Sequence, residues 1–93
     1  MQGIDTYSPL TYYLHVMATA YTQSEQKILK QVGSKIRALR SETGLSQEDF
    51  AKKVDLDRTY ISDVERGERN VSILNLFKIA KGLKKPASLL LEK

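Results

Sequence analysis

The sequence predicts an all-α protein: a compact five-helix bundle over residues 25 to 93, with an additional helix nearer the N-terminus. Apolar residues recur three and four positions apart along several segments, the spacing that places them on one face of an α-helix. Neither the alternation typical of β-strands nor an internal repeat is visible. Loops of two to six residues separate the segments, and short helices joined in this way pack around one core.

Residues 1 to 24 form an N-terminal arm in which a helix is expected at about residues 8 to 22. Ser8-Pro9 is a good helix start, and apolar side chains follow at helical spacing, namely Leu10, Tyr13, Leu14, Met17, Ala18 and Tyr21. Because this helix has no charged side chain, we expect it to pack on its own domain or on a partner chain, or to stay partly disordered. Met17 is also a candidate start codon, which would make the preceding segment dispensable.

The first helix of the bundle is predicted from about Ser24 to Thr43, and Gly44 stops it. In its middle, Gly33 weakens the helix by roughly 1 kcal/mol relative to alanine. A glycine there favours close packing against a neighbouring element. The apolar face of this helix is predicted to consist of Ile28, Val32, Ile36 and Leu39.

Residues 46 to 66 are predicted to form two short helices joined by a tight turn. Ser46 can cap the first by accepting hydrogen bonds from amides two and three positions on. Asp49 occupies the place of the reciprocal partner in a capping box, although Asp is shorter than the preferred Glu or Gln. Asp55-Leu56 then interrupts the apolar pattern. The buried stripe of this helix is predicted to be Phe50, Ala51 and Val54.

The second helix of this pair has one apolar side and one polar side. Asp57 can cap it, because a carboxylate is favoured at a helix N-terminus, and Gly67 ends it. Ile61 and Val64 supply the buried side. The outward side is polar and is headed by Arg58, Thr59 and Tyr60, with Ser62 and Arg66 following. This is the layout of a helix-turn-helix that reads DNA.

Two more helices are expected after a charged loop over residues 67 to 71. Ser72 can cap the fourth helix, which closes at Gly82, and Pro86 suits the first turn of the fifth. The apolar face of the fourth helix is predicted to be Ile73, Leu76, Phe77, Ala80 and Leu83, and the fifth contains Leu89, Leu90 and Leu91.

The charge of the chain favours an anionic partner. Its 93 residues carry 15 Lys and Arg against 11 Asp and Glu, a net charge of +4. Asp5 is the only formally charged side chain in residues 1 to 24, so the remainder has 15 basic and 10 acidic groups. A basic domain suggests binding to nucleic acid or to another anionic surface, although an ordinary charge imbalance is the simpler alternative.

Several functional classes are not expected from this composition. With no cysteine, the chain can form neither a disulfide nor a cysteine-based zinc site, which fits a reducing cytoplasm. No apolar run approaches the roughly 18 residues of a membrane span. Ala18-Thr19-Ala20 mimics a signal-peptide cleavage site, but no basic residue precedes it, and we reject that interpretation. His15 is the only histidine, and without a nucleophile–base pair, metal cluster or phosphate loop we expect neither catalysis nor a cofactor or metal.

Residues 33 to 83, GSKIRALRSETGLSQEDFAKKVDLDRTYISDVERGERNVSILNLFKIAKGL, resemble the Cro and phage-repressor type of helix-turn-helix regulators. The motifs G-x-x-I-R-x-L-R, G-L-S-Q-E-x-x-A and I-S-x-x-E-R-G occur in the order found in that family. More narrowly, L-D-R-T-Y-I-S with E-R-G-x-R-N-x-S resembles the controller proteins of restriction–modification systems. Asp63 departs from the pattern, since many relatives have a small or neutral residue there, and residues 1 to 24 lie outside it.

The resemblance implies that Arg58, Thr59 and Tyr60 lie on the first turn of a recognition helix that reads base edges. Arginine can donate two hydrogen bonds to O6 and N7 of guanine. Thr59 can donate, accept or touch a thymine methyl group. Tyr60 would contact a base step or a phosphate, or else pack half-buried against the core.

Other residues match positions of the family that bind the DNA backbone. Gln47 matches a phosphate-binding position, while Arg69 and Asn70 match positions that reach the backbone or a groove edge. Ser62 is a weaker candidate. Arg66 would either contact DNA or counter the C-terminal end of its own helix.

Arg40 and Glu65 match a buried ion pair that ties the first helix of the bundle to the third. The resemblance therefore assigns both residues to the scaffold rather than to the DNA surface.

Together these features predict a sequence-specific, DNA-binding transcription regulator, and more narrowly a restriction–modification controller that binds operator DNA. Because one recognition helix reads only a few base pairs, we expect a homodimer, with Leu89, Leu90 and Leu91 offering apolar surface. An activator would also contact RNA polymerase. We do not expect a membrane partner. The alternatives are a prophage-type repressor and an antitoxin-like protein-interaction module.

Overall fold

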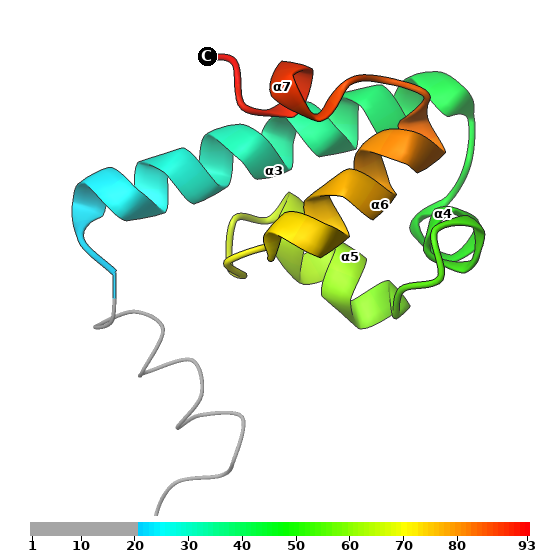
Figure 1. The fold of residues 1–93 in the computed structure, drawn as a ribbon. Helices are drawn as coiled ribbons and strands as arrows, with labels where there is room; N and C mark the ends of the chain where they lie inside the picture. Colours follow the sequence, from blue (N-terminus) through cyan, green and yellow to red (C-terminus); the bar gives the residue numbers. More distant parts are fainter. Residues whose placement is uncertain (1–20) are drawn as a thin grey trace, which may run out of the picture.

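The computed structural model describes residues 21 to 93, and the secondary structure of this part is all helical. The prediction of an all-α fold is confirmed there. The helix expected at about residues 8 to 22 and the candidate start at Met17 lie outside the described residues, apart from Tyr21 and Thr22. These two residues are not helical, and Thr22 is the extended N-cap residue of the next helix. Figure 1 shows the helices in chain order, α3 (Gln23–Thr43), α4 (Gln47–Lys53), α5 (Arg58–Glu65), α6 (Ile73–Leu83) and α7 (Ala87–Leu90).

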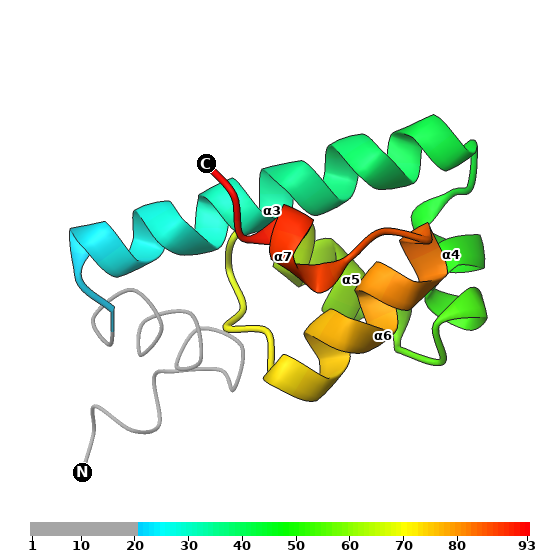
Figure 2. The same cartoon turned by 45° about the horizontal axis from the view of Figure 1, so that its top comes forward.

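The long helix α3 is the central helix of the bundle. It contacts α5, α6 and α7, while α4 contacts α5 and α6 contacts α7. Figure 1 shows α4, α5 and α6 below α3, with α7 lying against it. In the turned view of Figure 2, α7 sits beside α6 at the same side of α3. The short helices therefore share one core beneath α3, and the N-terminal end of α3 extends past them.

Side-chain caps set the helix starts as expected at three positions. Ser46, Asp57 and Ser72 accept hydrogen bonds from backbone amides in the first turns of α4, α5 and α6. Helix α3 begins slightly before the predicted Ser24, because Thr22 and Glu25 form a capping box with distances of 2.9 and 3.1 Å.

Pro86 was expected in the first turn of the last helix, but it is the N-cap residue just before α7. Its backbone is extended, with φ −69° and ψ 144°, so it precedes the helical conformation rather than beginning it.

The predicted apolar faces are partly wrong at their edges. In α6, Ile73 and Phe77 are 72% and 59% exposed, whereas Ile79, which is not among the predicted face residues, is fully buried. Ile28 of α3 is also exposed, because the end of the helix that bears it extends past the core. The core consists of Val32, Ile36, Phe50, Ala51, Val54, Ile61, Val64, Leu76, Ile79, Ala80, Leu83 and Leu90.

The close approach predicted at Gly33 is confirmed, and the neighbour is α5. A Cβ atom at this position would lie 2.2 Å from the carbonyl oxygen of Val64 and 2.8 Å from that of Glu65. Only a residue without a side chain lets the two helices approach so closely. Gly33 thereby sets the distance between α3 and the C-terminal end of α5.

Candidate nucleic-acid interface

Helix α5 is held to the core by one side and left free on the other. Ile61 and Val64 are buried beneath it. At its N-terminus, Oδ2 of Asp57 accepts a hydrogen bond of 2.9 Å from the amide of Thr59. The turn before it contains Asp55 in the left-handed conformation, with φ of 58°. The start and the orientation of α5 are therefore fixed by local bonds and packing before any ligand binds.

The residues expected to read bases head the free side of α5. Arg58 and Thr59 are exposed, and Tyr60 is half-buried against the edge of the core. The guanidinium of Arg69 lies 5.0 Å from the centre of the Tyr60 ring, within the range of a cation–π contact. Tyr60 is thus both a packing residue and part of the polar face.

A buried network around Glu65 joins three helices. Nε and Nη2 of Arg40 donate to the two carboxylate oxygens of Glu65, at 2.6 and 3.0 Å, which confirms the ion pair expected between α3 and α5. Nη1 of Arg40 also donates to the carbonyl of Leu45, at 2.8 Å. Hydrogen bonding to Glu65 raises the pKa of the Arg40 guanidinium above its ordinary value, although burial opposes this.

Gln47, expected at a phosphate, belongs to the same network. Its Nε2 donates to Oε1 of Glu65 at 2.9 Å, and the side chain is half-buried. The bond holds the first turn of α4 against the end of α5. Its amide has a second N–H and a carbonyl oxygen, so the network orients Gln47 without using all of its hydrogen-bonding capacity.

A second polar cluster lies on the outward side of α5, centred on Asp63. Its Oδ1 accepts from Nη2 of Arg66 at 2.6 Å, and its Oδ2 accepts from Nη2 of Arg69 at 3.2 Å. Arg66 also donates to Oγ of Ser62 and, at 3.1 Å, to Glu68. In the sequence, Asp63 stands out only as a departure from the family pattern. Its spacing of three from Arg66 was a detectable signal, but the contact with Arg69 depends on how the loop folds back.

Asn70 faces a different part of the molecule from Arg58. It is exposed in the loop before α6 and lines a shallow recess with Tyr21, Glu25, Ile28 and Leu29. The structure thus places Arg58, Thr59, Tyr60, Ser62, Arg66 and Arg69 on or over the free side of α5, Gln47 beside the end of that helix, and Asn70 toward α3.

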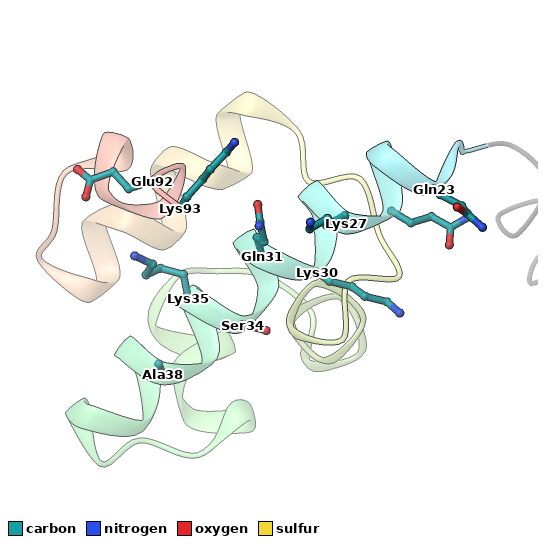
Figure 3. Close-up of a pocket in the computed structure, with 10 residues that line it drawn as sticks. Gln23, Lys27, Lys30, Gln31, Ser34, Lys35, Ala38, Glu92 and Lys93 are labelled. Carbon is teal, nitrogen blue, oxygen red and sulfur yellow. The ribbon is translucent and has the colours of Figure 1, made fainter.

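One pocket, which runs along α3, does not suggest an active site. It has a volume of about 660 Å³, and Lys27, Lys30, Lys35 and Lys93 are among the residues that line it (Figure 3). Its other lining residues are glutamines, Ser34, Ala38 and Glu92. Within residues 21 to 93, no group of three acidic, histidine or cysteine side chains is placed to hold a metal ion. No helix in this part is long and apolar enough to cross a membrane.

Comparison with known proteins identifies the family. A family model described as helix-turn-helix matches residues 36 to 90, which is more than half of the chain. The chain belongs to this helix-turn-helix family. The matched region includes α4 and α5 with the turn between them, so the family prediction made from residues 33 to 83 is confirmed.

Several similar proteins are controllers of restriction–modification systems. The chain is 60% identical over 52 residues to control protein C.MunI of a Mycoplasma species, covering 55% of this chain and 70% of that protein. It matches the crystal structure of the restriction–modification controller C.AhdI of Aeromonas hydrophila with a TM-score of 0.65 and 45% identity, over 67% of this chain and 94% of that one. The controller C.Esp1396I, solved as a tetramer with its 35-base-pair operator, matches with a TM-score of 0.63 and 44% identity, over 68% and 83% of the two chains. The narrower resemblance to controller proteins is therefore confirmed.

Proposed function

We propose that this helix-turn-helix protein is a cytoplasmic transcription regulator that binds operator DNA as a dimer and controls a restriction–modification system. The observation that carries the proposal is the free side of α5, where Arg58 and Thr59 are exposed at the N-terminus of a helix anchored from behind. In helix-turn-helix proteins the recognition helix lies in the major groove with its N-terminal residues on the base edges. The likeness to C.MunI and C.AhdI supports the controller role.

In this proposal the polar residues divide into two groups. Arg58, Thr59 and Tyr60 read base edges from the first turn of α5, with Arg58 bonded to a guanine. The second group, Gln47, Ser62, Arg66 and Arg69, binds phosphates or the groove edge and sets the register of α5 on the duplex. Asn70, exposed in the loop after α5, would reach the DNA backbone from the side nearer α3. An activating controller would in addition contact RNA polymerase. The direct test is binding of the protein to DNA upstream of neighbouring endonuclease and methyltransferase genes.

Replacing Arg58 with alanine is expected to cost about 1–3 kcal/mol of specific binding and to relax the preference at one base position. The reason is that a bidentate arginine–guanine contact is lost while the phosphate contacts remain. Gel-shift titrations on operator variants at each base position would measure both effects. Lys27→Ala is the matched control, because it removes the same charge from the lysine-lined side of α3. Equal losses on operator and random DNA for Arg58→Ala would show that Arg58 contacts only the backbone.

The surface proposed to join two copies consists of exposed apolar residues outside α5, although Val64 of α5 lines the groove among them. Ile73, Leu74 and Phe77 of α6 are exposed, as are Ile28 and Leu91. A groove of about 220 Å³ between α3 and the start of α6 lies among them, with Val32 and Leu76 in its lining. The expectation for Leu89, Leu90 and Leu91 needs correction, because Leu90 is fully buried in its own core and Leu89 is half-buried. Of the three, Leu91 is the one well exposed for a partner.

Replacing Phe77 with serine is expected to convert the dimer to a monomer at tens of micromolar protein and to lower operator affinity at least about tenfold. An exposed phenylalanine at a dimer surface contributes a large apolar area, and a monomer binds only one half-site. Sedimentation equilibrium and a gel shift would measure the two effects. Lys78→Ser is the control on the same helix, since Lys78 is also exposed. A stable dimer of the Phe77→Ser variant would place the interface elsewhere.

A further inference from the structure

Asp63 occupies an unexpected place for a carboxylate. It follows Thr59 by four residues and precedes Arg66 by three, so all three lie on the outward side of α5. That side faces the phosphates in the proposed function, and a bare negative charge there would oppose DNA. Yet the Asp63 side chain is only 16% exposed. Its carboxylate is paired rather than bare.

Two arginines from different parts of the chain pair with the carboxylate of Asp63. Arg66, the C-cap residue of α5, approaches Oδ1 at 2.6 Å, and Arg69 approaches Oδ2 at 3.2 Å from the loop beyond Gly67. Arg69 is also placed over the ring of Tyr60. The carboxylate of Asp63 thus pairs with both arginines, and Arg69 connects it to Tyr60 in the first turn of α5.

This arrangement changes what the two arginines can do in the absence of operator. A guanidinium bonded to a carboxylate has fewer donors to offer a phosphate, and its side chain is held in one orientation. Nonspecific DNA binding depends almost wholly on the electrostatic attraction between cationic side chains and phosphates. Two cations that share one anion contribute less to that attraction than two free ones. In the operator complex, by contrast, arginines that are already oriented can contact the DNA without changing their geometry.

We propose that Asp63 is a positioning residue for operator selectivity. It holds the side chains of Arg66 and Arg69 in fixed orientations beside α5, and it lowers the affinity for DNA that lacks the operator sequence. The inference rests on the proposed function, because it concerns how the same surface distinguishes operator from other DNA. Asp63 itself makes no contact with a base.

The test is the Asp63→Asn variant, which keeps the shape of the side chain but removes its charge and leaves one acceptor oxygen. Its matched control is Glu68→Gln, which changes the net charge equally and removes an ion pair with Arg66 alone, also leaving one acceptor oxygen. Two duplexes serve as probes: one selected by the wild-type protein from a random-sequence library, and a shuffled duplex of the same composition. Affinity is measured on both over a range of salt concentrations, and circular dichroism verifies folding.

For Asp63→Asn we expect shuffled-DNA affinity to rise several-fold, and the ratio of selected to shuffled affinity to fall about tenfold or more. The slope of log affinity against log salt on shuffled DNA should steepen by about 1–2, because the released arginines neutralise additional phosphates. Glu68→Gln should show a smaller change in the affinity ratio and in the salt slope. In an Arg69→Ala background, the effect of Asp63→Asn should shrink, because one of its two partners is gone.

Three results would overturn the inference. Equal behaviour of the Asp63→Asn and Glu68→Gln variants would show a general charge effect. Loss of selected-DNA binding with no gain and no change of slope on shuffled DNA would show that Asp63 contacts a base, for example a cytosine amino group. An Asp63→Asn variant that is unfolded by circular dichroism would assign Asp63 to stability. Failure of the wild-type protein to enrich any sequence from the library is a distinct outcome, which would reject the proposed function itself.

Discussion

Replacing Glu65 with alanine is expected to lower the free energy of unfolding by about 3–5 kcal/mol. The side chain of Glu65 is 2% exposed and accepts hydrogen bonds from both Arg40 and Gln47. Its removal leaves the Arg40 guanidinium, itself largely buried, without its carboxylate partner. An uncompensated charge in the interior is what makes breaking one side of a buried pair so costly. Urea denaturation followed by circular dichroism would measure the loss.

The control for this prediction is Glu48→Ala. Glu48 pairs with Lys52 at 3.8 Å on the exposed side of α4, and both side chains are in solvent. Exposed pairs of this kind contribute about 0.2–1 kcal/mol at most, so this variant should be close to wild type. A loss below about 1 kcal/mol for Glu65→Ala would mean that water enters the site and solvates Arg40, contrary to the buried character described above.

Replacing Gly33 with alanine is expected to destabilise the fold by about 3 kcal/mol, near the upper end for overpacked sites. Alanine is the better helix former, so propensity alone would favour it by roughly 1 kcal/mol. Packing decides the outcome, because the new methyl group would lie 2.2 Å from the carbonyl oxygen of Val64. A backbone atom cannot rotate out of the way, so α3 and α5 must move apart. Thermal unfolding would report the effect as a lowered midpoint.

Ser34→Ala provides the comparison one residue along the same helix. Ser34 is exposed, and alanine there should be neutral or slightly stabilising. The pair of variants separates helix propensity from interhelical contact. Equal stability of Gly33→Ala and wild type would mean that the two helices are not held at the distance described.

Local signals were sufficient to predict most of the helical framework. Ser46, Asp57 and Ser72 cap where a short polar side chain precedes an apolar period, because the capping bond involves only nearby residues. The approach at Gly33 was also predictable, since a glycine inside a long helix needs a reason to be there. Caps and close contacts leave traces in the sequence at the positions where they act.

What could not be predicted depends on three-dimensional packing. Ile73 and Phe77 fit the period of α6 as well as Ile79 does, and only the direction in which α6 meets α3 decides which of them is buried. The bond between Gln47 and Glu65 joins residues 18 positions apart. Likewise, the meeting of Arg69 with Tyr60 requires the loop after α5 to fold back. The DNA-contact roles of the site residues remain predictions.

The exposed apolar residues of the proposed dimer surface lie on α3, α6 and the end of α7, whereas the exposed residues proposed to read bases lie on α5. In a two-fold complex, the side chains of α5 determine which bases are preferred, whereas the joining surface determines how far apart the two half-sites must be. Base preference and half-site spacing therefore depend mainly on different residues, although Arg69 and Asn70 lie where the two surfaces meet. A lineage could acquire a new operator spacing by changes at positions such as Phe77 while its base preference is inherited intact, or change its bases at Arg58 without rebuilding the assembly.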